Sequence, residues 1–238
     1  IKYSGSGRAA VAAIGGNVMV ALPVALLVGF VLTQLMAAPV IDVHKADHLL
    51  ADLDPLSWAV PHAAIAGFYL FLSGLINGYF DNQAAYANIG QRIGRLRWLQ
   101  LLLGKQRAAR VGCYVGDHLG GIMGNFLFGC MLGSTGVIGK MLGLPLDIRH
   151  IAFASANFIH GIFNIYANTG EFPEIGIILV SLFGVMVIGM INLLVSFSLA
   201  LMTALRARNV KVFEWKFLFE LVASHLMTQP ADFFIPRK

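Results

Sequence analysis

Charged side chains divide this chain into long apolar segments. Five runs contain no Asp, Glu, Lys or Arg, and they cover residues 9–41, 55–80, 118–139, 150–170 and 175–205. A helix needs about 20 apolar residues to cross the hydrocarbon core of a bilayer, and each run reaches that length. The pattern predicts an all-α, polytopic integral membrane bundle with four to five embedded helices, one of them possibly re-entrant.

Composition supports a membrane protein. Hydrophobic residues make up 58% of the chain and charged residues only 12%, whereas soluble domains are about one quarter charged. We therefore expect residues 1–238 to form a single membrane domain. The chain begins with Ile1 rather than Met, and we expect it to be part of a longer protein.

Two basic segments lie between or after the apolar runs. In residues 81–117, apolar side chains recur every three or four positions between arginines, which is typical of an amphipathic helix. We interpret this segment as a helix lying on the cytoplasmic leaflet; an ordinary helical hairpin is the alternative. The tail, residues 206–238, shows the same mixture and is interpreted in the same way.

The signs of the charges predict an orientation. The N-terminal segment, residues 81–117 and the tail hold 14 of the 17 basic residues, while residues 42–54 and 171–174 hold six acidic residues and one Lys. Basic loops stay in the cytoplasm, so both termini are expected inside and the two acidic connections outside. Termini on one side require an even number of crossings. We expect four, with either 118–139 or 150–170 turning back or packing within the protein.

Glycine recurs along one part of the chain at intervals of four or five residues. The stripe consists of Gly112, Gly116, Gly120, Gly124, Gly129 and Gly133. Small residues at this spacing let membrane helices approach closely, so helix packing is the favoured interpretation. Helices broken at glycines, as in transporters, are the alternative.

One polar cluster enters an apolar run. Asp147, Arg149 and His150 lie together at its edge, and Asn157 and His160 follow at helical spacing. Together with Asn125, these residues form the candidate polar site, because ionisable groups inside a membrane are usually functional. The alternative is a helix start, with Asp147 near the N-cap and Arg149 extending outward.

Other chemistry finds little support in the residues. There is no Cys-x-x-Cys, no P-loop and no Gly-x-Ser-x-Gly. We predict no metal, no cofactor and no catalytic residue, and a non-enzymatic role is favoured. The net charge of +5 is expected to face anionic lipid rather than nucleic acid. Expected partners are membrane lipid and other protein subunits or further copies of the chain.

Three strings resemble a known family: HAAIAGFYLFLSGLINGYFDN at 62–82, GNFLFG at 124–129 and LPLDIRHIAF at 144–153. They are similar to the C-terminal membrane portion of a proteobacterial family labelled "site-specific recombinase". The resemblance implies a bacterial inner-membrane location and a longer parent chain. Its label implies DNA recombination, yet no His-x-x-Arg occurs here and the serines fall largely in apolar runs, so no catalytic residue is carried over.

Three functions follow as hypotheses. The first is an inner-membrane protein that binds or transports a small molecule or lipid. The second is a membrane scaffold that docks a partner helix on the glycine stripe. The third is the recombination-related role that the family label states.

Overall fold

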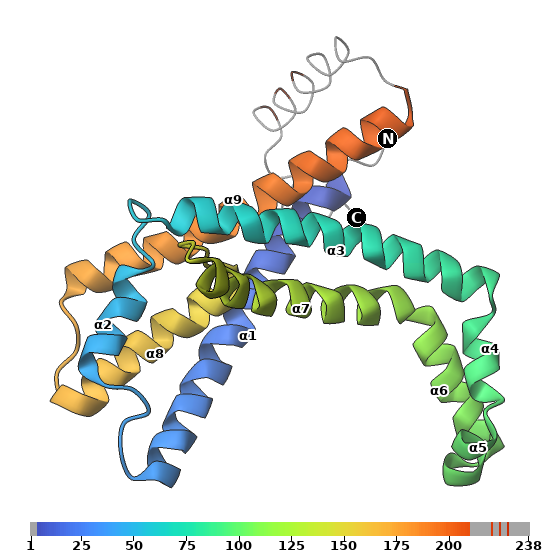
Figure 1. Ribbon diagram of the computed structural model, residues 1–238, viewed down its shortest axis with the longest axis horizontal. Helices are drawn as coiled ribbons and strands as arrows, with labels where there is room; N and C mark the ends of the chain where they lie inside the picture. The colour runs from blue at the N-terminus through green and yellow to red at the C-terminus, as the bar shows by residue number, and fades with distance from the viewer. Residues whose placement is uncertain (1–3, 210–219, 221–223, 225–227, 229–238) are drawn as a thin grey trace. The chain divides into compact units, whose positions relative to one another are not determined.

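The computed structural model describes residues 4–209, together with Glu220, Ser224 and Thr228, and places side chains from residue 15 onward (Figure 1). These residues form helices and no strand, which confirms the predicted all-α fold. The helices are α1 (Ser4–Met36), α2 (Val43–Ala51), α3 (Ala59–Tyr86), α4 (Ile89–Gly94), α5 (Arg97–Leu103), α6 (Lys105–Asp117), α7 (Leu119–Leu142), α8 (Ile151–Thr169) and α9 (Ile175–Ala207).

Each of the five apolar runs is a helix: α1, α3, α7, α8 and α9. Within the described residues, four helices are long and apolar enough to cross a membrane: α1 from Gly15, α3, α7 and α9. Helix α8 is not among them. Only 11–33% of the residues in each apolar window are buried inside the protein, so these helices present extensive apolar surface, as lipid-facing helices do.

The chain divides into two compact units, which are described separately. The first combines residues 1–67 and 149–238, and the second is the continuous segment 68–148. Helix α3 contributes its first turns to one unit and the rest to the other. The prediction of one membrane domain concerns the whole chain and stays a prediction.

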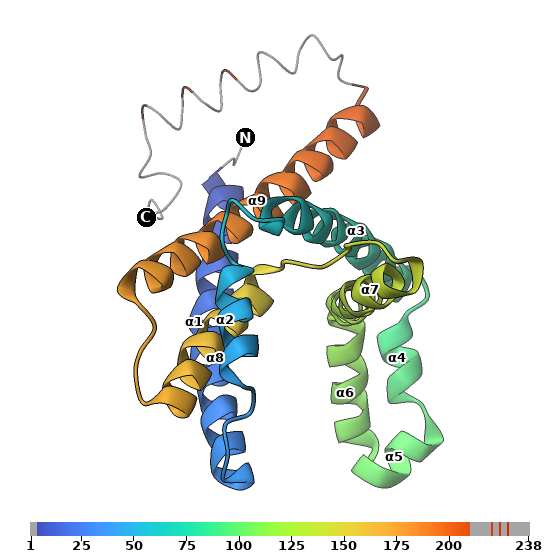
Figure 2. The same cartoon turned by 60° about the vertical axis from the view of Figure 1, so that its left-hand side comes forward.

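In the first unit, α8 packs against α1, α2 and α9 (Figures 1 and 2). Glycines permit the closest contacts: Gly161 of α8 lies against the Leu50 side chain, and Gly184 of α9 lies against the Leu53 carbonyl. The core around them is almost entirely aliphatic. Its buried members are Ala46, Leu50, Leu53, Ala59, Ala63, Ile151, Ala154, Phe158, Ile165, Val185 and Ile188.

Side-chain amides tie the connection before α2 to the far end of α8. The Ile41 N–H donates to Asn164 Oδ1 at 3.2 Å, and the Ile41 carbonyl accepts from Asn168 Nδ2 at 2.9 Å. At the other end of α2, Ser181 Oγ donates to the Leu50 carbonyl at 3.2 Å. Both ends of α2 are therefore fixed by polar groups of α8 and α9.

In the second unit, polar residues one turn apart on α3 face glycines of α7. Ser73 Oγ donates to the Gly124 carbonyl at 3.1 Å. Asn77, with its amide nitrogen turned toward α7, donates to the Gly120 carbonyl at 2.7 Å. Asp81 Oδ1 accepts from the Gly120 N–H at 2.9 Å. That N–H belongs to the first turn of α7 and has no partner within its own helix, so α3 caps α7.

The segment 81–117 is a helical hairpin rather than one long amphipathic helix. After α3 ends, α4 and α6 pack against each other, and α5 forms the tip (Figure 1). Gly90 and Gly94 of α4 meet Gly112 and Gly116 of α6, with backbone against backbone. The structure thus agrees with the hairpin interpretation; its place on the membrane stays a prediction. The tail helix predicted within 206–238 lies almost wholly outside the described residues.

The glycine stripe therefore divides into two parts. Gly112 and Gly116 are in contact with α4, and Gly120 and Gly124 are in contact with α3 of the same chain. Positions 129 and 133 have no neighbour within 4 Å of an added Cβ. A partner helix would find only this second part of the stripe open.

Alanine substitutions can separate the two parts. We expect Gly124→Ala to lower the free energy of unfolding by about 1–3 kcal/mol, because its methyl group would collide with the Asn77 amide. Gly133→Ala should leave stability unchanged or raise it by up to about 1 kcal/mol, since alanine favours helix. Thermal unfolding of the purified chain in detergent measures both, and equal effects would contradict this packing.

Candidate functional site

One polar cluster of the first unit lies where the end of α2, the start of α8 and the middle of α9 meet. We call it the Arg149 junction and define it by Asp52, Arg149, His150 and Asn192. Asp52 is the C-cap residue of α2, and His150 is the N-cap residue of α8. Asn192 lies near the middle of α9.

Asn192 joins three segments of backbone. Its Oδ1 accepts from the Ile151 N–H at 3.0 Å, and its Nδ2 donates to the carbonyls of Ala63 at 2.8 Å and Arg149 at 3.0 Å. The residue is only 2% exposed. Its amide satisfies the first N–H of α8, which no helical carbonyl can reach. One neutral side chain therefore fixes the start of α8 beside the middle of α9.

Arg149 forms an ion pair with Asp52. Its Nη2 lies 3.0 Å from Asp52 Oδ2, and the two side chains are 12% and 50% exposed. The guanidinium is thus largely enclosed, while half of the carboxylate surface remains open. Charge in a mostly apolar unit is costly unless it is paired.

His150 caps α8. Its Nδ1 accepts from the Ala152 N–H at 3.4 Å, which requires this ring nitrogen to be unprotonated. The ring meets Phe153 edge-on, with centroids 6.2 Å apart. A neutral imidazole is therefore part of the helix start.

The residues of the predicted polar site are divided between the two units. Arg149 and His150 lie in the junction, and Asn157 and His160 follow on α8, where His160 lies against Gly29 of α1. Asn125 is exposed on α7 and, like Asp147, belongs to the second unit.

The helix-start alternative needs two corrections. The N-cap residue of α8 is His150 rather than Asp147, whose Oδ1 accepts from the Ile148 N–H at 2.7 Å. Arg149 turns to Asp52 instead of extending outward, because an ion pair offsets the cost of enclosing its charge.

Two members of the junction were missed by the sequence analysis. Asn192 was visible as a single amide in a charge-free run, a position where a polar group needs a partner. Asp52 was grouped with its acidic neighbours as an external charge. Pairing between residues so far apart in sequence leaves no local signal.

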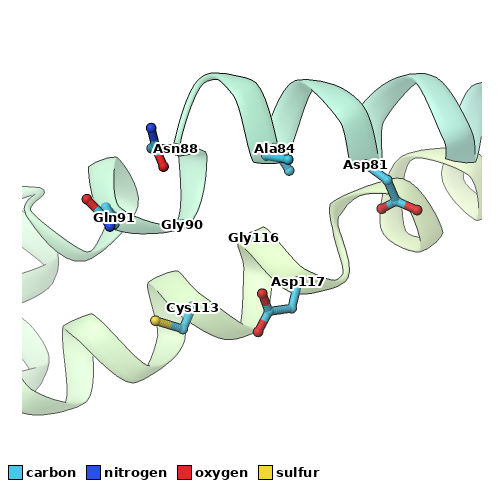
Figure 3. Close-up of a pocket in the computed structure, with 9 residues that line it drawn as sticks. Asp81, Ala84, Asn88, Gly90, Gln91, Cys113, Gly116 and Asp117 are labelled. Atoms are coloured by element: carbon cyan, nitrogen blue, oxygen red, sulfur yellow. The ribbon is translucent and has the colours of Figure 1, made fainter.

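A second polar feature is a cavity of about 380 Å³ in the second unit (Figure 3). Asp81 and Asp117 come to it from the ends of α3 and α6, and the backbone of Gly90 and Gly116 forms part of its wall. The Asp81 carboxylate already caps α7 by accepting a hydrogen bond from the Gly120 N–H. Among the described residues, no group of three or more His, Cys, Asp or Glu side chains is placed to hold a metal ion.

The fold and the junction define a helical membrane protein with a buried polar centre. A family model described as site-specific recombinase matches residues 5–236, and the chain belongs to that family. Nothing among the curated proteins matches the chain. Nothing among the solved structures matches it either.

The junction makes a direct prediction for Asn192. Asn192→Ala would leave the Ile151 N–H and the Arg149 carbonyl without this partner, at a cost of about 1–3 kcal/mol for each buried group. The Ala63 carbonyl loses only its second hydrogen bond, because it lies within α3. We expect a markedly lower thermal midpoint in detergent. Asn157→Ala, a half-buried amide on α8, is the matched control and should cost less than about 1 kcal/mol. Similar losses in both variants would contradict the joining role of Asn192.

Proposed function

We propose that this chain is an integral protein of the bacterial inner membrane, with both termini in the cytoplasm, that binds or transports a small polar solute at the Arg149 junction. Four apolar helices and the distribution of basic residues support the location and the orientation. The observation that carries the functional part is an ion pair, with its guanidinium largely enclosed, beside the middle of α9.

The depth of the junction follows from α9. This helix is charge-free from Ile175 to Leu205 and is flanked by Glu174 and Arg206. If these charged ends flank the bilayer, Asn192 lies near its middle, and so does the start of α8, which Asn192 holds. The other end of α8 leads through residues 171–174 directly into the start of α9. Helix α8 then runs beside the half of α9 that precedes Asn192.

A helix that starts at mid-depth and ends at the outer face does not cross. In this topology α1, α7 and α9 cross as single helices. Helices α2 and α3 together make the fourth crossing, because Asn192 holds Ala63 of α3 at the same depth as the start of α8. The chain re-enters through residues 144–150 and returns along α8. Non-helical backbone at membrane depth is tolerated where protein groups satisfy it. Asn192 does this for the Arg149 carbonyl and the Ile151 N–H.

Helices that begin within the membrane are found at solute sites in transporters, where their ends point at the bound group. Here the start of α8 brings Arg149 and His150 to one place. A cluster that only held the helices together would need no charged side chains, because Asn192 already forms hydrogen bonds with the backbone groups there. The half-open Asp52 carboxylate is the group that we expect a solute to reach or replace.

Cysteine accessibility tests this site. In a chain carrying Cys113→Ser and Cys130→Ser, Asp52→Cys removes the partner of Arg149 and places a thiol beside the guanidinium. We expect this thiol to react with membrane-impermeant thiosulfonate reagents. The negatively charged reagent, which carries a sulfonate, should react faster than the positively charged reagent, which carries a trimethylammonium group, because Arg149 attracts the anion. Adding Arg149→Gln should abolish that preference.

Two positions calibrate the measurement. Phe172→Cys, at a side chain 68% exposed in the connection between α8 and α9, should react rapidly and show no dependence on Arg149, whereas Val185→Cys, at one 2% exposed, should react slowly. If Asp52→Cys reacted as slowly as Val185→Cys, water would not reach the junction, and the proposed solute site would be contradicted.

The scaffold hypothesis is the second candidate. The open positions Gly129 and Gly133 on α7 favour it, since a partner helix could approach closely there. Crosslinking between copies through Cys130, which lies next to this face in sequence and is exposed, would support a homo-oligomer.

The family description keeps a recombination-related role as a third candidate. Strand exchange requires a nucleophile that DNA can reach, whereas Ser73, Ser155 and Ser181 are buried within the protein. Strand exchange by the purified chain, lost on substitution of a single nucleophile, would establish this role.

A further inference from the structure

The tip of the α4–α6 hairpin combines exposed apolar and basic side chains. We define the hairpin tip as residues 95–107, which include all of α5. Leu101 and Leu102 follow Trp98 by three and four residues, so the three side chains lie on one face of this short helix. They are 59%, 86% and 74% exposed. The face is therefore open apolar surface.

The hairpin holds this face in place. Leu99, on the other side of α5, is buried, and Gln100 Nε2 donates to the Gly94 carbonyl at the end of α4 at 2.8 Å. Gly104 turns the chain into α6 with a φ of 77°, a conformation that glycine adopts without strain. The outward direction of Trp98 is thus set by packing on the opposite side.

Charge surrounds the apolar face. Between Asp81 and Asp117 the chain has no acidic residue. Its basic side chains in this interval are all exposed. They are Arg92, Arg95, Arg97, Lys105, Arg107 and Arg110.

We propose that the hairpin tip binds the surface of an anionic phospholipid bilayer, with Trp98, Leu101 and Leu102 inserted at headgroup level and the basic side chains on lipid phosphates. Amphipathic segments that bind membranes have this composition. Nucleic acid would engage the arginines but would leave two leucines in water. The leucines therefore favour lipid.

The geometry of the second unit allows this contact. The helical path breaks at Asn88, whose φ is 49°, and again at His118 between α6 and α7. The hairpin turns away from the direction of α3 and α7 at these two breaks (Figures 1 and 2). If α3 and α7 cross the bilayer, the hairpin extends sideways along its surface instead of into the cytoplasm.

Fluorescence of Trp98 tests the proposal on the full chain in nanodiscs. Trp58→Phe and Trp215→Phe leave Trp98 as the single tryptophan. In nanodiscs containing phosphatidylglycerol, brominated acyl chains should quench Trp98 by about twofold, because the ring lies at the interface. In phosphatidylcholine alone, quenching should be clearly weaker.

Variants separate the two contributions. Arg95→Gln with Arg97→Gln should remove most of the dependence on anionic lipid, and Leu101→Ser with Leu102→Ser should reduce quenching in both lipids. Leu56→Ser, an equally exposed leucine of the other unit, is the control and should leave Trp98 unchanged. Absence of quenching, equal quenching in both lipids, or loss of quenching on addition of a DNA duplex would overturn the proposal.

Discussion

A peptide group that loses water inside an apolar protein needs a partner, and in this chain side-chain amides and a carboxylate provide it where helices begin or end. Asn192 is the clearest case, since its three hydrogen bonds hold the start of α8, the loop before it and the first turns of α3. Asn164 and Asn168 do the same for Ile41 at the other end of α8. In the second unit, Asn77 and Asp81 bind the first turn of α7.

These contacts place polar groups at fixed positions along otherwise apolar helices. Apolar packing alone would let helices slide, because leucine and lipid tails are equally apolar. Hydrogen bonds to particular carbonyls fix the register, and glycines beside them let the backbones approach closely. Such positioning does not require the Arg149–Asp52 ion pair, and for that reason the proposed solute site centres on it.

The sequence predicted the helices well, because a charge-free run and a membrane-length helix follow from the same physical requirement. It also identified Arg149 and His150 from ionisable groups at the edge of a run. It could not identify Asp52 as the partner of Arg149, since that pairing depends on how α2 lies along α8. In the same way, the amphipathic pattern over residues 81–117 left a surface helix and a hairpin as alternatives, because the turns at Asn88 and Gly104 are set by local backbone conformation.

The central claim is that α8 turns back while α7 crosses, and the side on which residue 141 lies tests it most directly. In the chain without its native cysteines, Met141→Cys should be labelled from outside intact cells, as Phe172→Cys should be. Gln106→Cys in the hairpin should be labelled only after the membrane is opened. All three positions are exposed on the protein. If Met141→Cys is instead protected together with Gln106→Cys, then α8 crosses the membrane and this account of the chain is wrong.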